Sequence, residues 1–184
     1  MAKPSSVFVW LDLEMTGLDP ERCAIVEVAA LVTGPELEPK EEFEQVVWQP
    51  DEMLWRMEPI VRDMHAKSGL TDRVRASPHS LRETERDLFD MVARHAAPGE
   101  GILAGNSIHH DRRFLARYMP LVDRYLSYRQ VDVSSLKLLT RAWYPDSPPY
   151  QKPESNHRAL ADIRASIAEL RYYRETFFRA NPAK

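Results

Sequence analysis

With 184 residues, of which 43% are hydrophobic and 29% charged, the chain has the length and composition of one soluble globular domain, and residues 7–179 are expected to form its ordered core. No segment has the roughly 20 apolar residues of a membrane span or the apolar run of a signal peptide, and the lone Cys23 excludes an intrachain disulfide, so we expect a cytoplasmic protein. The net charge of −3 excludes the broad basic excess of proteins that track long nucleic acids; a nucleic acid partner would have to be short, or metal ions would have to supply the positive charge.

The first part of the chain predicts three strands. VFVWLDL, residues 7–13, is apolar on both faces and therefore central in a sheet. CAIVEVAALVT, residues 23–33, forms the second strand and ends before Gly34 and Pro35. EEFEQVVWQP, residues 41–50, alternates polar and apolar residues, which predicts a third strand with one wetter face.

Helices dominate the middle of the chain. Residues 51–75 predict short helices that are interrupted by Pro59 and stopped by Gly69. A long amphipathic helix follows, for which Ser77 is the expected N-cap and Pro78 the first helical residue. Its apolar stripe consists of Leu81, Leu88, Met91 and Val92.

Strands and helices alternate after residue 100. GEGILAGNS predicts a short strand that leads into a helix, IHHDRRFLARYM, and YRQVDVSS predicts a fifth strand before the helix SLKLLTRAWY. A proline-rich loop precedes a final helix over residues 157–179, whose inward residues are Ala159, Ile163, Ile167 and Leu170. The pattern predicts an α/β fold with a mixed five-stranded sheet flanked by helices.

Two carboxylates follow the first apolar run directly. Asp12 and Glu14 are two positions apart on a strand, so their side chains share one face, whereas Leu11 and Leu13 take the other. Adjacent carboxylates raise each other's pKa unless a cation lies between them, and Mg²⁺ and Mn²⁺ prefer such oxygen ligands. An isolated D-x-E at a solvated strand end remains the alternative.

Three later residues complete an acidic pattern. Asp111 falls in the first turns of a helix that follows a strand, and His157 precedes Asp162 by five residues. Five helical residues place two side chains on different faces, so we expect His157 on the loop or first turn and Asp162 one turn inside. A histidine at the edge of a metal site could act as a general base, although a lone histidine is more often a cap or a surface residue.

These residues, in this order, resemble the DEDDh family of 3′→5′ exonucleases, which has a ribonuclease H-like fold. The blocks LDLEMTGLDP, MHAKSGL, GNSIHHDRRFL, YRQVDVSSLK and HRALADI resemble its oligoribonuclease branch and extend from residue 7 to about residue 170. The resemblance implies hydrolysis of very short oligoribonucleotides, especially dinucleotides, to 5′-mononucleotides. It also implies that two divalent ions, Mg²⁺ or Mn²⁺, are held by Asp12, Glu14, Asp111 and Asp162, with His157 as general base.

Substrate contacts are expected on both sides of this acidic set. Gly17 would let the backbone approach a ligand and Leu18 would wedge against a base, unless Leu18 simply packs into the core. His65 is placed by the resemblance near the 3′ nucleotide. Many relatives have a tryptophan a few residues before this histidine, where the present chain has Ile60.

A second group of residues is suited to the other end of the substrate. Tyr128 offers a stacking ring, and hydrogen-bond donors for a terminal phosphate are offered by Arg129, Ser107, Ser134 and Ser135. By resemblance these residues cap the 5′ phosphate, and the tyrosine comes from the other subunit of a homodimer. Arg129 could instead pair with Asp123 or Asp132 on the surface.

Two other functions stay open at this point. One is a DEDDh exonuclease that trims or proofreads longer RNA or DNA ends, which cleavage of a dinucleotide and of a 10-mer would distinguish. The other is a catalytically idle member that only binds nucleotides or forms a scaffold. The presence of all five catalytic positions favours an active enzyme.

Overall fold

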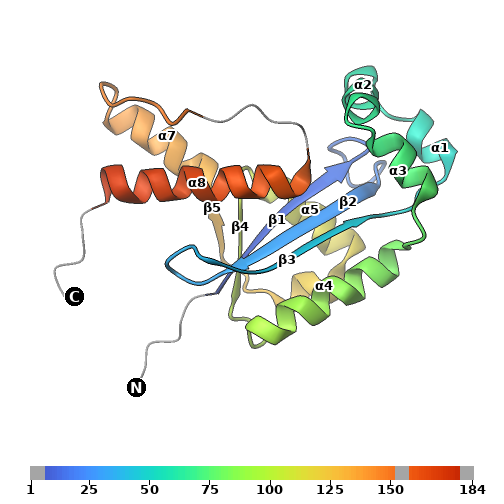
Figure 1. Cartoon of the computed structure of the whole chain (residues 1–184), viewed down its shortest axis with the longest axis horizontal. Helices are drawn as coiled ribbons and strands as arrows, with labels where there is room; N and C mark the ends of the chain where they lie inside the picture. Colours follow the sequence, from blue (N-terminus) through green and yellow to red (C-terminus); the bar gives the residue numbers. More distant parts are fainter. Residues whose placement is uncertain (1–6, 152–157, 179–184) are drawn as a thin grey trace.

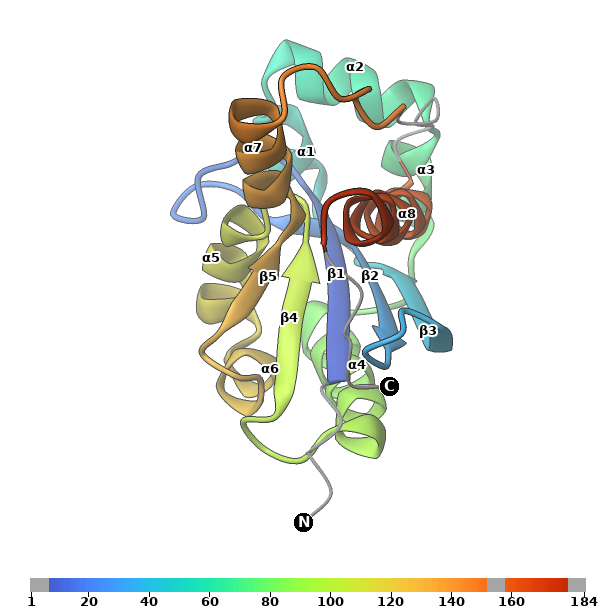
Figure 2. The ribbon, with the colours of Figure 1, turned by 90° about the vertical axis from the view of Figure 1, so that its left-hand side faces the viewer.

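The computed structural model describes residues 7–151 and 158–178 and has a mixed five-stranded sheet at its centre (Figure 1). The strands lie side by side in the order β3-β2-β1-β4-β5, which Figure 2 shows from the side. Their bounds are β1 Val7–Met15, β2 Ile25–Thr33, β3 Pro39–Val46, β4 Gly101–Gly105 and β5 Gln130–Asp132. The predicted α/β class with a mixed five-stranded sheet is confirmed.

The strand directions follow from the connections between them. β1, β2 and β3 pair antiparallel in sequence order and are joined by short turns. β4 pairs parallel with β1, and β5 pairs parallel with β4, so helices cross over between these strands. As predicted, β1 is central, and every residue of β2 is buried.

Helices cover both faces of the sheet and one of its ends. On one face, α4, α5 and α6 pack on the Leu11 and Leu13 side of β1, and on the other face α7 and α8 pack on the Trp10 side. The short helices α1–α3 gather near the end of β1 (Figure 1). The helix bounds are α1 Asp51–Trp55, α2 Pro59–Lys67, α3 Leu70–Ala76, α4 Leu81–His95, α5 His109–Tyr118, α6 Pro120–Tyr125, α7 Val133–Trp143 and α8 Ala159–Phe177.

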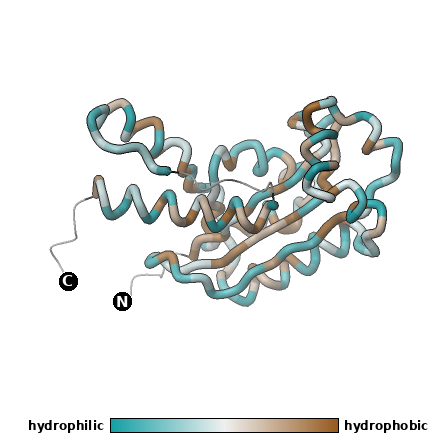
Figure 3. The backbone as a smooth tube through the Cα atoms, turned by 45° about the horizontal axis from the view of Figure 1, so that its top comes forward, coloured by the Kyte–Doolittle hydropathy of each residue, from teal (hydrophilic) through white to brown (hydrophobic). Residues whose placement is uncertain are grey.

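The core follows the hydrophobic pattern of the sequence. Figure 3 shows hydrophobic stretches along the central strands and alternating hydrophilic and hydrophobic segments along the helices. Leu88, Met91 and Val92 of α4 are buried, as are Ala159, Ile163 and Ile167 of α8. Among the helices of the described residues, none has the combination of length and apolar character that crossing a membrane requires.

The start of the long helix differs from the prediction. Ser77 has an extended backbone and ends α3, and its hydroxyl donates to the Val46 carbonyl instead of capping a helix. The N-cap of α4 is Ser80, whose Oγ accepts from the Glu83 N–H while the Glu83 carboxylate accepts from the Ser80 N–H. This reciprocal capping box satisfies two backbone donors at once, so the helix begins three residues later than a cap at Ser77 implies.

Three further boundaries were wrong or missed. β3 ends at Val46 rather than at residue 50: the Val47 N–H still bonds to the Val26 carbonyl of β2, but the Trp48 N–H bonds to the His79 carbonyl, outside the sheet. As predicted, α2 stops before Gly69, which has φ +71°, but the further helix α3 that begins directly after this glycine was missed. Helix α6 was not predicted; it begins at Pro120, whose missing N–H is tolerated at a first helical position.

We expect Thr33→Val to lower the free energy of unfolding by about 1–3 kcal/mol, because it leaves the buried Nε1–H of Trp10 without a hydrogen-bond acceptor. The Trp10 side chain is fully buried, and its Nε1–H donates to Thr33 Oγ1 at 3.0 Å. Urea unfolding would measure the change. Thr71→Val is the matched control, since the Thr71 hydroxyl is buried without a hydrogen bond among the described residues. An equal loss in both variants would contradict the assigned role of the Trp10 bond.

Candidate active site

Three carboxylates meet where β1 emerges from the sheet. Asp12 and Glu14 lie on the α8 face of β1, and Asp162 lies in the first turn of α8. One ligand oxygen of each carboxylate lies within 4.8 Å of the others, and all three residues are half-buried. The period-two argument for Asp12 and Glu14, and the expected position of Asp162 one turn inside its helix, agree with this geometry.

Asp111 approaches the same strand from the opposite side. The pairing of β1 with β4 ends at Trp10 and Ala104, so the Leu13 N–H has no ladder partner there; Asp111 Oδ1 accepts its proton at 2.9 Å. The carboxyl is nearly fully buried on α5, and burial raises its pKa to about 7 although the Leu13 bond favours the charged form. Asp111 therefore lies beside the three-carboxylate cluster without joining it.

Glu14 is buried among other carboxylates. Burial is the largest cause, and together with the charges of Glu27, Asp162 and Asp111, in that order, it raises the pKa of Glu14 from its ordinary 4.5 to about 8. Glu27 is the cross-strand partner of Glu14 on β2 and is fully buried, where Arg73 pairs with it at 2.8 Å. The repulsion is relieved either by a proton or by a cation.

The donor set fits a divalent metal ion. Asp12, Glu14 and Asp162 offer only carboxylate oxygens, which are the ligands of hard cations such as Mg²⁺ and Mn²⁺. Burial and three neighbouring carboxylates raise the pKa of Glu14, so its charged form is disfavoured as long as no cation lies beside it. A bound cation would stabilise the charged carboxylates, so these converging residues are suited to hold one.

The first turn of α8 is fixed by contacts with two strands. Arg158 donates to Glu44 Oε1 of β3 at 3.2 Å, and the Ala159 N–H points at Glu27 Oε2 of β2 at 3.5 Å. These contacts set the height of Asp162 above the sheet. The predicted general base, His157, lies outside the described residues, immediately before this anchored turn.

His65 lies beneath the acidic cluster and not on its surface. Its side chain is fully buried in α2, with Nε2 2.9 Å from the Met15 carbonyl and Nδ1 3.9 Å from Glu14 Oε2. In this arrangement it contacts Glu14 and the end of β1. Its contact with a 3′ nucleotide stays a prediction.

The turn after β1 carries an exposed apolar side chain. Leu18 is 61% exposed and is not tucked into the core, which favours the wedge over the packing alternative. A Cβ at Gly17 would lie 2.8 Å from Cys23 Sγ, so glycine is required for packing of the turn itself. Both residues line an open pocket of about 1060 Å³ beside α1 and α5. Ile60 is 76% exposed on α2, as an apolar replacement for a stacking tryptophan would be.

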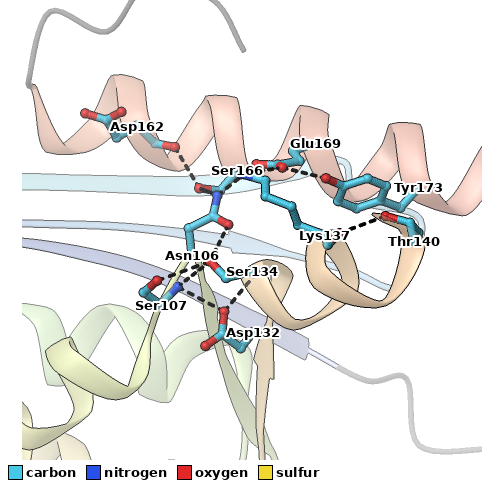
Figure 4. Close-up of polar contacts among 10 residues, drawn as sticks. All are labelled: Asn106, Ser107, Asp132, Ser134, Lys137, Thr140, Asp162, Ser166, Glu169 and Tyr173. Carbon is cyan, nitrogen blue, oxygen red and sulfur yellow. Dashed lines mark hydrogen bonds and ion pairs between the residues drawn. The ribbon is translucent and has the colours of Figure 1, made fainter. Parts of the chain in front are cut away.

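Ser107, which follows β4, and Ser134, which follows β5, lie in hydrogen-bonding contact. Ser107 has φ +50°, a left-handed conformation that is unusual for a residue with a side chain. Its N–H donates to Asp132 Oδ1 at 2.9 Å and to Ser134 Oγ at 3.0 Å, and the two serine hydroxyls are 3.2 Å apart (Figure 4). Two of the predicted phosphate contacts, Ser107 and Ser134, are thus brought together, with Asp132 as the N-cap of α7.

The remaining predicted contacts are exposed, and Tyr128 and Arg129 come directly before β5, at the other end of this strand from Ser134. Tyr128 is 79% exposed, and the Arg129 guanidinium lies 4.7 Å from the centre of its ring. Asp123, the alternative partner of Arg129, pairs with Arg112 at 2.7 Å. Ser135 is exposed in the first turn of α7.

Comparison with known proteins identifies the family. Residues 9–170 match the RNase T family model, described as "Exonuclease". The chain is 44% identical over 172 residues to the oligoribonuclease of Marinobacter nauticus, covering 93% of this chain and 96% of that protein. It is 49% identical over 178 residues to the oligoribonuclease of Corynebacterium glutamicum, covering 95% and 81%. The chain belongs to the oligoribonuclease family of exonucleases.

Solved structures share the fold of this oligoribonuclease family member at low sequence identity. Exonuclease I from Methylocaldum szegediense superposes with a TM-score of 0.71 at 22% identity, covering 93% of this chain and 41% of that one. Exonuclease I of E. coli in complex with a 5cy-dT13 oligonucleotide gives 0.71 at 17% identity, covering 94% and 41%. The chain thus spans about two fifths of the length of these exonucleases. The superposition agrees with the predicted ribonuclease H-like exonuclease fold.

Two residues of the site were missed from the sequence. Glu27 is hidden in a fully buried strand, where its position opposite Glu14 depends on the register of β1 and β2. Asn106 stands directly before Ser107, and its side chain bonds to residues of α7 and α8. The sequence signal was that Glu27 interrupts an otherwise apolar strand and that Asn106 follows an apolar strand directly. This signal does not indicate which residues they contact.

We expect the metal-free protein to lose stability as pH rises from about 5 to about 8, and Glu14→Gln to reduce this loss. The pKa of Glu14 is raised to about 8, so the folded state retains a proton that the unfolded state releases above the ordinary value of 4.5. Stability is therefore highest below that value and falls through this window. Asp111, with its pKa raised to about 7, contributes in the same direction.

Thermal unfolding in EDTA across this pH range would measure the effect. Glu52→Gln on α1 serves as the control, because it removes the same charge from an exposed residue outside the cluster. An unchanged pH slope in Glu14→Gln, relative to the control, would contradict the assigned environment of Glu14.

Proposed function

We propose that this chain is a 3′→5′ exoribonuclease that degrades very short oligoribonucleotides, dinucleotides above all, to 5′-mononucleotides. The observation that carries the proposal is the cluster of Asp12, Glu14 and Asp162 at the end of β1, in a chain whose relatives named oligoribonuclease align over nearly its full length. Full-length relatives include that of Aromatoleum aromaticum, with 43% identity over 183 residues.

The acidic residues would hold two divalent ions, Mg²⁺ or Mn²⁺. Asp12, Glu14 and Asp162 supply oxygens that already converge, and Asp111 lies on the other side of β1 with one oxygen on the Leu13 N–H. When bound, two such ions would stabilise the attacking water and the departing 3′ oxygen of an in-line displacement. His157 would accept the proton of that water, since an imidazole titrates near the working pH.

The other residues would bind and measure the substrate. Leu18, exposed on the turn after Glu14, would separate the two bases. The hydroxyls of Ser107, Ser134 and Ser135 and the guanidinium of Arg129 would hold the 5′ phosphate. A substrate capped in this way needs no extended basic groove, which is consistent with the net charge of −3.

A homodimer would complete this site. Tyr128 is 79% exposed, so its ring is available to a second copy of the chain. On α7, directly after the serines, Leu138 is 65% and Trp143 67% exposed, an apolar surface of the kind that subunit interfaces bury. We propose that the tyrosine of each subunit stacks on the substrate of the other.

A length series tests the reaction. With 5′-phosphorylated di-, tri-, hepta- and decaribonucleotides we expect the highest kcat/KM for the dinucleotide and complete loss of cleavage in EDTA, because the 5′ cap accommodates only a short strand. Release of mononucleotides can be followed by chromatography. A strong preference for the decanucleotide would contradict the proposal and favour an enzyme that trims longer ends.

We expect His157→Ala to bind Mn²⁺ like the parent protein but to lower kcat by about 10²–10⁴-fold, as removal of a general base does. Calorimetric titration with Mn²⁺ and turnover of a dinucleotide would measure the two properties separately. His79→Ala, in the loop before α4, is the matched control and should change neither. A normal kcat in His157→Ala would refute the assignment of the base.

A further inference from the structure

Asn106 joins the two parts of the proposed substrate site. It follows the last residue of β4 and is flanked by the serine pair on one side and by α8 on the other (Figure 4). Its Oδ1 accepts from Ser134 Oγ at 3.1 Å. Its Nδ2 donates to Ser166 Oγ at 2.9 Å and to Glu169 Oε2 at 3.1 Å. One amide thus contacts α7 and α8 together.

The α8 side of this contact leads directly to the acidic cluster. Ser166 lies one turn after Asp162, and its hydroxyl donates to the Asp162 carbonyl at 2.9 Å. Asp162 supplies one of the three converging carboxylates. The Asn106 amide is therefore two hydrogen bonds away from the backbone that carries a predicted metal ligand.

A buried carboxylate fixes the same junction. Glu169 is 1% exposed and receives Lys137 Nζ of α7 at 2.9 Å, Tyr173 Oη of α8 at 2.7 Å and the Asn106 amide. These donors lower the pKa of Glu169 against the opposing effect of its burial, which raises it. A buried charge with three donors from three segments allows little relative displacement of those segments.

We propose that Asn106 is a positioning residue that fixes the distance between the 5′-phosphate contacts on α7 and the acidic cluster beneath α8, and so selects substrate length. The inference rests on the proposed function. A strand of two nucleotides must reach both ends of the site at once, so a change in the spacing penalises the dinucleotide more than a longer, more adaptable strand. Misplacement by as little as ~1 Å can lower a rate by ~10²-fold.

Two substitutions at Asn106 separate the two sides of the junction. Asn106→Ala removes all its side-chain bonds, whereas Asn106→Asp keeps an acceptor for Ser134 but loses both donors to α8 and faces Glu169 with a like charge. We expect both variants to lower the kcat/KM ratio of a 5′-phosphorylated dinucleotide over the matching tetranucleotide by about tenfold. Removal of the 5′ phosphate should penalise the dinucleotide less in these variants than in the parent protein.

Matched controls distinguish positioning from general damage. Gln45→Ala removes another amide contact between sheet and helix, that of Gln45 Nε2 to Asp87 Oδ2 at 2.9 Å, and should leave the length ratio unchanged. Ser166→Ala removes the bond from Asn106 Nδ2 and the bond to the Asp162 carbonyl but leaves Asn106 bonded to Ser134 and Glu169, and it should shift the ratio in the same direction but less. This milder variant carries the test if Asn106→Ala unfolds. Calorimetric titration with Mn²⁺ reports on the acidic cluster independently of turnover, and we expect Asn106→Ala to change its affinity less than twofold.

The outcomes are separable. A dinucleotide and a tetranucleotide losing kcat/KM equally in Asn106→Ala and Ser166→Ala would overturn the inference and assign the junction a purely structural role. A selective loss on the dinucleotide, with dependence on the 5′ phosphate, would support it. Failure of the parent protein itself to prefer the dinucleotide would refute the proposed function instead, and is visible in the same experiment.

Discussion

Repulsion among carboxylates at the end of β1 is the constraint on which the rest of the site depends. Asp12 and Glu14 share a strand face, and α8 adds Asp162 to them. The fully buried Glu27, paired with Arg73, adds a further charge behind Glu14 and raises its pKa with the others. Such a cluster persists because the sheet and the helix fix its members in place, and a divalent ion would turn the repulsion into binding energy.

The early end of β4 creates the space for chemistry around β1. Because the pairing with β4 stops at Trp10, the next part of β1 has an open side, on which Asp111 accepts the Leu13 N–H. The chain leaves β4 through Asn106 and Ser107, which turn toward α7 and α8. The end of β4 therefore leaves room for Asp111 beside β1 and positions Asn106 and Ser107. The carboxyl ends of the strands are the usual location of ligand-binding sites in α/β sheets.

The length of the substrate and the net charge of the protein are related, because a shorter substrate presents fewer phosphates to be neutralised. An enzyme that holds only a few phosphates has no use for an extended basic surface, and this chain carries a net charge of −3. Neutral hydrogen-bond donors at the serine pair would bind the terminal phosphate, and cations at the acidic cluster would supply the required positive charge. The spacing of these two sites, fixed through Glu169 and its donors, would then decide which lengths react.

The sequence by itself determined the class of the fold, the shared face of Asp12 and Glu14, and the first-turn position of Asp162, because each follows from the periodicity of one strand or helix. The predicted start of α4 was wrong even though it depends on local sequence, because Ser80 forms a reciprocal capping box and caps the helix in place of Ser77. Only the tertiary structure decided that Asp111 bonds to the backbone of β1 and that Asn106 bridges α7 and α8. These contacts join residues far apart in the chain, and no local pattern encodes which distant partner a polar side chain will meet.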